Sequence, residues 1–108
     1  MTTLSSHVLD VERGVPGQGV PIALYRADAL LAEAETNADG RVANLGAGEL
    51  DGGTYRLVFD VAAYFASQGR PAPFLRRVTI EFDIHEADPH YHVPLLLSPY
   101  ACTSYRGS

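Results

Sequence analysis

Four residues with useful chemistry close the sequence: Tyr105, Arg106, Gly107 and Ser108. Together they offer a phenol, a guanidinium, a hydroxyl and the α-carboxylate of Ser108, which can hydrogen-bond a polar substrate or stabilise charge on it. Terminal residues are disordered unless the fold ties them down. Here the apolar run 92–100 precedes them, and we expect it to be a strand that anchors the tail. The tail is therefore a candidate site, and the simpler alternative is a polar stub.

Two histidines and one arginine are further candidates. His7 and His92 each fall on the side of a predicted strand that faces away from the core. An imidazole can accept or donate a proton near neutral pH. Arg41 directly follows an Asp39-Gly40 turn, and its guanidinium could hold a planar heterocycle or a developing oxyanion through two donors. Each residue, taken alone, is equally compatible with a solvated surface position.

A metal site and a serine triad are the alternatives to this chemistry. His90 and His92 are two residues apart on a predicted strand, and His85 or His7 could complete a zinc site. No further ligands stand at a diagnostic spacing, so we predict neither a metal nor another cofactor. No nucleophile-elbow motif supports a Ser-His-Asp triad.

Composition limits the class of protein. The 108 residues fit one domain, 1–108, and the net charge of -5, with no lysine, argues against nucleic acid or an anionic membrane as partner. Cys102 is the single cysteine, which excludes an intramolecular disulfide. With no signal-like start and no apolar stretch of membrane-spanning length, we expect a cytoplasmic protein.

The elements that must position these residues are mostly strands. Alternating apolar residues predict strands over 4–10, 20–25, 54–59, 78–84 and 92–98. Segment 27–35 has helical propensity, but its alternation and the turn at 36–40 favour a strand. Asp60 and Gly69 delimit one helix over 61–68, and Pro94 indicates an edge position for its strand. The pattern predicts an antiparallel β-sandwich.

Four blocks of this sequence resemble those of the 5-hydroxyisourate hydrolases, a family of transthyretin-like proteins, over essentially the whole chain. The blocks are Ser5-Ser6-His7-Val8-Leu9-Asp10, Thr36-Asn37-Ala38-Asp39-Gly40-Arg41, the run 90–99, and Tyr105-Arg106-Gly107-Ser108. The resemblance implies an all-β, transthyretin-like antiparallel β-sandwich of two four-stranded sheets, with one short helix near residues 60–68. It also implies a homotetramer with active sites in a channel between dimers.

The resemblance further implies an activity in urate degradation, the hydrolysis of 5-hydroxyisourate to 2-oxo-4-hydroxy-4-carboxy-5-ureidoimidazoline. Matched by motif, the catalytic residues are His7, Arg41, His92 and Ser108, and the substrate-binding residues are His7, Arg41, Tyr105 and Arg106.

Our hypothesis for the reaction assigns one task to each group. His92, oriented by the Ser108 hydroxyl or the α-carboxylate, takes a proton from water, and Arg41 stabilises the oxyanion. His7 positions substrate or relays a proton. The sequence leaves open which histidine is the base.

Two other functions compete with hydrolysis. A transthyretin-like carrier would bind a small ligand without turning it over, but it would not need His7, His92 and the four-residue tail together. A structural β-sandwich domain would be expected to carry an export signal or neighbouring domains, and neither is visible in the sequence.

Overall fold

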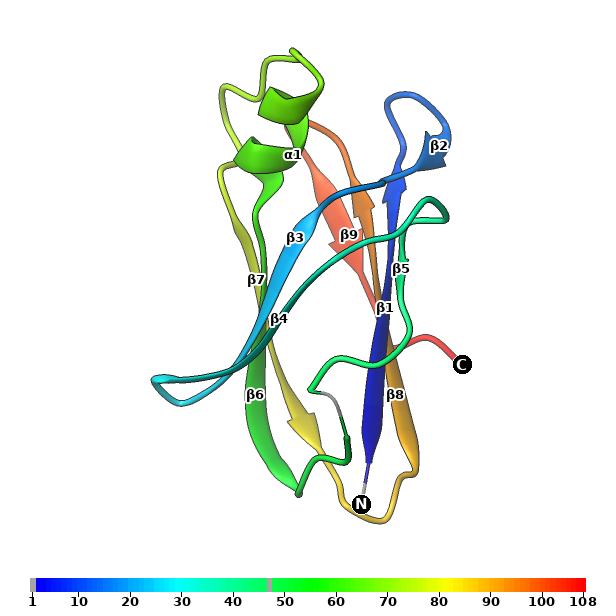
Figure 1. The fold of residues 1–108 in the computed structure, drawn as a ribbon, viewed down its shortest axis with the longest axis vertical. Helices are drawn as coiled ribbons and strands as arrows, with labels where there is room; N and C mark the ends of the chain where they lie inside the picture. Colours follow the sequence, from blue (N-terminus) through cyan, green and yellow to red (C-terminus); the bar gives the residue numbers. More distant parts are fainter. Residues whose placement is uncertain (1, 47) are drawn as a thin grey trace.

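The computed structural model describes residues 2–46 and 48–108, and it shows two β-sheets packed face to face with one short helix at one end (Figure 1). The helix, α1, spans Val61–Ser67. The strands of the described residues are β1 Thr3–Asp10, β2 Val15–Pro16, β3 Pro21–Arg26, β4 Ala29–Glu35, β5 Arg41–Val42, β6 Gly53–Phe59, β7 Val78–Ile84, β8 His90–Leu97 and β9 Cys102–Ser104. The predicted transthyretin-like β-sandwich with one short helix is confirmed, as is the strand interpretation of segment 27–35.

The topology of the two sheets places the ends of the chain side by side. One sheet has the order β2-β1-β8-β9, with β5 also pairing with β1, and the other has the order β4-β3-β6-β7. β1 and β8 run parallel, in register from Thr3 opposite His90 to Asp10 opposite Leu97. The predicted antiparallel sandwich thus contains one parallel pair, because the chain crosses the entire second sheet between its two members.

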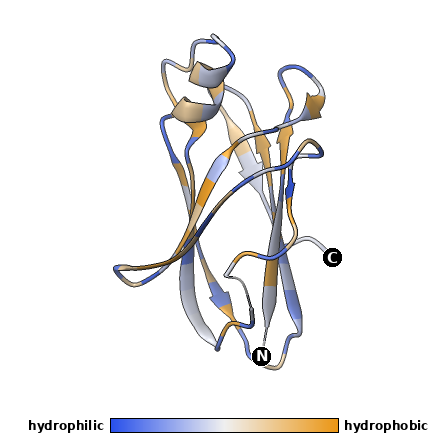
Figure 2. Cartoon of the chain, in the orientation of Figure 1, coloured by the Kyte–Doolittle hydropathy of each residue, from blue (hydrophilic) through white to orange (hydrophobic). Residues whose placement is uncertain are grey.

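Alternation along the strands builds the core between the sheets. Figure 2 shows hydrophobic and hydrophilic residues alternating along several strands. Val20, Ile22 and Leu24 are at most 1% exposed, as their spacing predicts. The corresponding residues of β7 before Ile84 are only partly buried, because β7 is the last strand of its sheet.

The helix is capped and then fastened to the end of β1. The side chain of Asp60 accepts a hydrogen bond from the backbone N–H of Ala63, which satisfies one of the free amides of the first turn. The hydroxyl of Tyr64 donates to Oδ2 of Asp10 at 2.7 Å, and Nη1 of Arg70 donates to the same oxygen at 2.6 Å. The Asp10–Arg70 ion pair thus joins β1 to the segment after the helix, and the Tyr64 hydrogen bond joins β1 to the helix itself.

Two expectations about the last strands are corrected. Pro94 lies on β8, which is central between β1 and β9, and not at an edge. Leu95 pairs with Ser104 and His92 with Gly107, so the register in between puts Pro94 opposite Tyr105. The hydrogen-bonded pairing of β8 with the tail is interrupted at Pro94, which has no N–H to donate. This interruption explains how a central strand accommodates a proline. Strand β9 itself was not predicted, because it has three residues and little apolar pattern.

No helix in the described part of the chain is both long enough and apolar enough to pass through a membrane.

Candidate active site

Three strands bring the predicted residues together on the outer face of the first sheet. His7 lies opposite Arg41 in the β1–β5 pair, and Ser5 lies opposite His92 in the β1–β8 pair. Alternate side chains of a strand share a face, so Ser5 and His7 point away from the core, which Leu4 and Val8 fill. A pocket of about 290 Å³ opens on this face, lined by Ser5, Arg41, His90 and His92 among others.

Arg41 is held by the turn that precedes it. Oδ1 of Asn37 accepts hydrogen bonds from the backbone N–H groups of Asp39, at 2.9 Å, and Arg41, at 3.0 Å. Gly40 has φ +74°, and a Cβ there would meet the carbonyl oxygen of Val8 at 2.4 Å, so only glycine lets the turn close against β1. The predicted turn therefore fixes the point from which the guanidinium starts.

The contact made by His7 determines where its proton sits. Nε2 of His7 lies 2.9 Å from the carbonyl oxygen of Asp39. A carbonyl oxygen only accepts, so Nε2 carries a hydrogen and donates it. The other ring nitrogen, Nδ1, is left for a substrate or a water molecule.

His92 is clamped on both sides of its ring. Nδ1 lies 2.7 Å from Oγ of Ser5, and a Cβ built on Gly107 would come within 2.6 Å of Cδ2. Ser5 of β1 thus holds the Nδ1 edge of the ring, and Gly107 of the tail lies against the Cδ2 edge. Among the described residues, no hydrogen bond of the protein engages Nε2 of His92.

The surroundings of His92 favour its neutral form. Burial lowers the pKa of His92, and the positive charge of Arg41 and the imidazoles of His7 and His90 lower it further. A neutral imidazole has a lone pair with which to accept a proton. A neutral His92 can accept a proton, and Nε2 is the ring nitrogen that no hydrogen bond of the described residues engages.

The tail reaches this site through its backbone. The N–H of Gly107 donates to the carbonyl oxygen of His92 at 2.7 Å, which places Ser108 next to the histidine. Figure 1 shows the C-terminus on the side of the β1–β8 sheet that faces away from the second sheet. The structure therefore brings together His7, Arg41, His92 and the segment that carries Ser108.

The remaining predicted residues, Tyr105 and Arg106, are not brought to this pocket. The Arg106 guanidinium lies over the ring of Tyr91, 4.0 Å from its centroid, and donates to the carbonyl oxygen of His90. Tyr105 is 57% exposed. Both residues line a different, mostly apolar hollow of about 280 Å³ between β7 and β9, with Phe82 among its walls.

Sequence reasoning missed Ser5 and Thr3, which contact the histidines. Oγ of Ser5 lies 2.9 Å from Nε2 of His90, and Oγ1 of Thr3 lies 2.6 Å from Nδ1 of the same ring. The two-residue spacing of Thr3 and Ser5 matches that of His90 and His92, and this was the available signal. This matching spacing indicates contact between the residues only once β1 is known to pair with β8.

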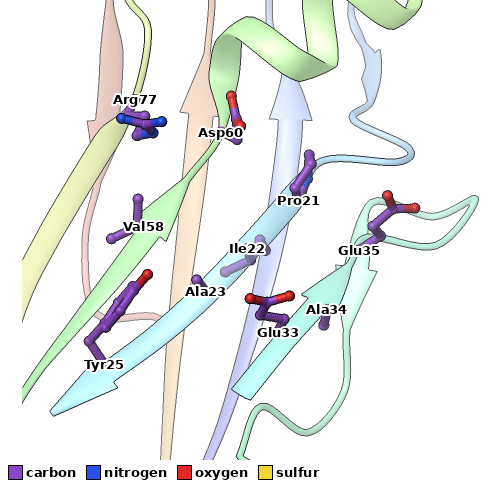
Figure 3. A pocket seen from close by; sticks show the side chains of 10 residues that line it. All are labelled: Pro21, Ile22, Ala23, Tyr25, Glu33, Ala34, Glu35, Val58, Asp60 and Arg77. Carbon is purple, nitrogen blue, oxygen red and sulfur yellow. The ribbon is translucent and has the colours of Figure 1, made fainter. Parts of the chain in front are cut away.

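The protein has a larger hollow elsewhere, on the outer face of the second sheet. Figure 3 shows its carboxylates and aromatic ring, and its volume is about 350 Å³. Its walls include Tyr25, Glu33, Glu35, Asp60 and Arg77, and it contains none of the predicted catalytic residues. Nor do the described residues contain a group of three or more histidine, cysteine or acidic side chains that could hold a metal ion.

Comparison with known proteins agrees with this arrangement. The model of the HIUase/Transthyretin family matches residues 4–107. The chain belongs to this family. Among HIUase/transthyretin members, 5-hydroxyisourate hydrolase of Pseudomonas aeruginosa is 44% identical, over 100% of this chain and 93% of its own length. The Rhizobium meliloti protein named 5-hydroxyisourate hydrolase 2 is 48% identical, over 97% of this chain and 95% of its own.

Solved structures of the family have the same fold. The Klebsiella pneumoniae 5-hydroxyisourate hydrolase superimposes with a TM-score of 0.92, at 42% identity and with full coverage of both chains. A sea bream transthyretin in complex with thyroxine superimposes with a TM-score of 0.82, at 30% identity, over 96% of this chain and 93% of its own. The family thus includes both hydrolases and a transthyretin that binds thyroxine, so the residues of the pocket must distinguish the two functions.

Proposed function

We propose that this protein hydrolyses 5-hydroxyisourate to 2-oxo-4-hydroxy-4-carboxy-5-ureidoimidazoline in urate degradation. The observation that carries the proposal is that Arg41 and His92 line one outer pocket, while His7 pairs with Arg41 and the tail pairs with His92 beside it. Full-length relatives at 42 to 48% identity bear the name of this hydrolase, which supports the same conclusion.

Hydrolysis of a cyclic amide begins with the activation of water. Nε2 of His92 accepts a proton from a water molecule whose oxygen attacks the carbonyl carbon of the substrate ring. The lowered pKa of His92 keeps it unprotonated, and therefore competent, at neutral pH. We assign the base to His92 and not to His7, because His92 lines the pocket that Arg41 also lines and His7 does not.

The attacked carbonyl oxygen becomes an oxyanion that must be stabilised. Arg41 supplies a fixed positive charge and two or more N–H donors from the edge of the pocket. The turn around Gly40 holds its backbone before substrate arrives, so little reorganisation is needed as the charge develops.

Collapse of the tetrahedral intermediate breaks the carbon–nitrogen bond. The leaving nitrogen takes the proton that Nε2 of His92 received from water, which returns the base to its initial state. Ser108 follows Gly107, the residue paired with His92, and we assign its hydroxyl to hold the attacking water or the ring. His7 orients the substrate through Nδ1. Substrate contacts of Tyr105 and Arg106 remain a prediction, which needs both side chains to turn from the β7–β9 side.

Assembly into a homotetramer completes the proposal. Among the described residues, the strand orders leave the outer edges of β7 and β9 unpaired, and the pocket between these strands is mostly apolar. Pairing with a second copy would cover these edges, and packing of two such dimers through the outer faces of their β1–β8 sheets would enclose the His92 pocket in a channel. Sedimentation analysis tests the tetramer directly. A cytoplasmic location also stays a prediction.

The test is an absorbance assay with 5-hydroxyisourate generated freshly from urate by a urate oxidase. Catalytic amounts of the protein should accelerate the loss of its ultraviolet absorbance well beyond spontaneous decay. No acceleration by a folded protein would reject the hydrolase. The carrier function would then be preferred, and a search for a bound ligand would follow.

A further inference from the structure

A continuous chain of hydrogen bonds leads from His92 along the wall of the pocket to the surface. Oγ of Ser5 stands between two imidazoles, 2.7 Å from Nδ1 of His92 and 2.9 Å from Nε2 of His90. Nδ1 of His90 then lies 2.6 Å from Oγ1 of Thr3, and Oγ1 of Thr3 lies 3.4 Å from the carbonyl oxygen of Pro89. His90 is exposed to solvent, whereas His92 is half-buried.

The proton count of this chain permits only two arrangements when both rings are neutral. A serine hydroxyl has one hydrogen, so Ser5 donates to one imidazole and accepts from the other. In the first arrangement Nδ1 of His92 donates to Ser5, Ser5 donates to Nε2 of His90, and Nδ1 of His90 donates to Thr3. In the second, every one of these bonds is reversed, and Nε2 of His92 carries the hydrogen.

The pocket side of His92 selects the first arrangement. Besides burial, three groups lower the pKa of His92 through their charge. They are the guanidinium of Arg41 on β5, the imidazole of His7 on β1 and the imidazole of His90 on β8 itself. Arg41 and His92 line the same pocket, and the positive charge of the guanidinium there favours a lone pair on Nε2 over an N–H. The first arrangement also lets the Thr3 hydroxyl donate to the Pro89 carbonyl, so each hydrogen in the chain has an acceptor.

We propose that Ser5 and His90 form a proton relay with His92, in which Ser5 is a positioning residue that holds the hydrogen of His92 on Nδ1 and His90 receives a proton during the reaction. This inference rests on the proposed hydrolase function. As Nε2 of His92 takes the proton of water, the Nδ1 hydrogen passes to Ser5 and the Ser5 hydrogen passes to Nε2 of His90. His90 becomes the cation, and His92 stays neutral with a hydrogen on Nε2. That hydrogen goes to the leaving nitrogen, and the relay then runs back.

The resting arrangement can be measured without any substrate. Nitrogen chemical shifts of the histidine rings, recorded by NMR on the neutral protein, should show the hydrogen of His92 on Nδ1. Ser5→Ala should move this hydrogen to Nε2. The control is Ser67→Ala, which removes a hydroxyl of α1 that donates to the Tyr64 carbonyl oxygen and should leave the hydrogen on Nδ1. A wild-type His92 with its hydrogen on Nε2, or one indifferent to Ser5→Ala, would refute the relay whether or not the protein is a hydrolase.

Turnover then separates positioning from proton transfer. Ser5→Ala should lower kcat by about ten- to a hundredfold, with a smaller change in KM, and Ser5→Thr should restore most of it. His90→Gln keeps an acceptor for the Ser5 hydroxyl but cannot take a proton. Its His92 should retain the hydrogen on Nδ1, while kcat falls about tenfold and recovers when imidazole buffer is added. His85→Gln, an exposed histidine in the turn before β8, is the matched control.

The NMR measurement and the turnover measurement together distinguish failure of the relay from failure of the proposed hydrolase function. A His90→Gln variant with wild-type kcat and no response to buffer would remove His90 from the relay. A protein with the expected histidine shifts but no activity on 5-hydroxyisourate would reject the proposed function and leave the hydrogen-bonded chain intact.

Discussion

Gly107 lies against the imidazole of His92 so closely that a Cβ at position 107 would come within 2.6 Å of Cδ2. The N–H of Gly107 also donates to the His92 carbonyl oxygen at 2.7 Å. The smallest residue of the tail is thus the one that sets the position of the proposed base. Its backbone needs no unusual φ, so the requirement for glycine comes from space alone.

Replacing Gly107 by alanine should therefore disable the site. The added methyl group must displace either the His92 ring or the tail, and displacement of a catalytic group by about 1 Å costs on the order of a hundredfold in rate. The measurement is kcat/KM for Gly107→Ala beside Gly48→Ala, where a Cβ meets nothing within 4 Å. Equal activities of the two variants would contradict the clamp.

Loss of the His92 imidazole should stop the chemistry and leave the fold unchanged. His92→Asn should lower kcat at least about a hundredfold, since the side chain can no longer accept a proton. Circular dichroism and the melting temperature should stay close to those of the wild type. Near-normal turnover in this variant would mean that another group is the base.

The acid limb of the pH profile should report the surroundings of His92. Burial and the charge of Arg41 lower the pKa of His92, so activity should persist to a pH below the ordinary histidine range and fall only as that lowered pKa is passed. Arg41→Gln removes a positive charge, which raises the pKa of His92 and moves the acid limb to higher pH. Arg41→Lys keeps the charge and should leave the limb in place. Coincident limbs in all three proteins would rule out the assigned electrostatic role.

The buried ion pair between Asp10 and Arg70 should control stability, not turnover. The Asp10 side chain is fully buried and that of Arg70 is 17% exposed. Burial alone would raise the pKa of Asp10, but hydrogen bonds from Arg70, Tyr64 and the Arg13 amide outweigh it and the net pKa is lowered. The carboxylate therefore stabilises the fold above its unfolded-state pKa of about 3.8, and this stabilisation is lost as the pH falls through the folded-state value.

Asp10→Asn should lower the free energy of unfolding at pH 7 by about 3 kcal/mol, because it leaves Arg70 without its buried counter-ion. Glu12→Gln, which alters the exposed partner of Arg70, should cost less than about 1 kcal/mol. Urea unfolding at pH 7 and pH 3 measures both effects, and the gap between wild type and Asp10→Asn should narrow at pH 3. A gap of the same size at both pH values would disprove the ionic origin.

Deleting residues 106–108 should abolish activity while the sandwich persists. The deletion removes the backbone contact to His92, the Ser108 hydroxyl and the Arg106 guanidinium over Tyr91. Arg106→Gln, which removes only the last of these, separates the contributions. If Arg106 binds substrate, this variant should raise KM. If it only packs on Tyr91, it should lower the melting temperature with KM unchanged.

Local patterns of the sequence predicted most elements, because alternation and capping are properties of neighbouring residues. The helix cap at Asp60 and the buried faces of β1 and β3 were read in this way. The position of Pro94 was misjudged, since the neighbours of a strand are chosen by segments far along the chain. The contact of Ser5 with His90 and His92 was missed for the same reason, because it exists only through the register of β1 with β8.

The parallel pairing of β1 with β8 also governs when the site comes into being. Thr3 and His90, which face each other across this pair, are 87 residues apart. Contacts between residues so far apart in the sequence form late in folding, because the entropy cost of closing a long loop comes before any stabilisation from the contact. During synthesis His7 emerges early, but it has no His92 beside it until most of the chain has left the ribosome. Turnover is consequently a property of the nearly finished chain, and an interrupted translation product would hold half of the pocket and none of its activity.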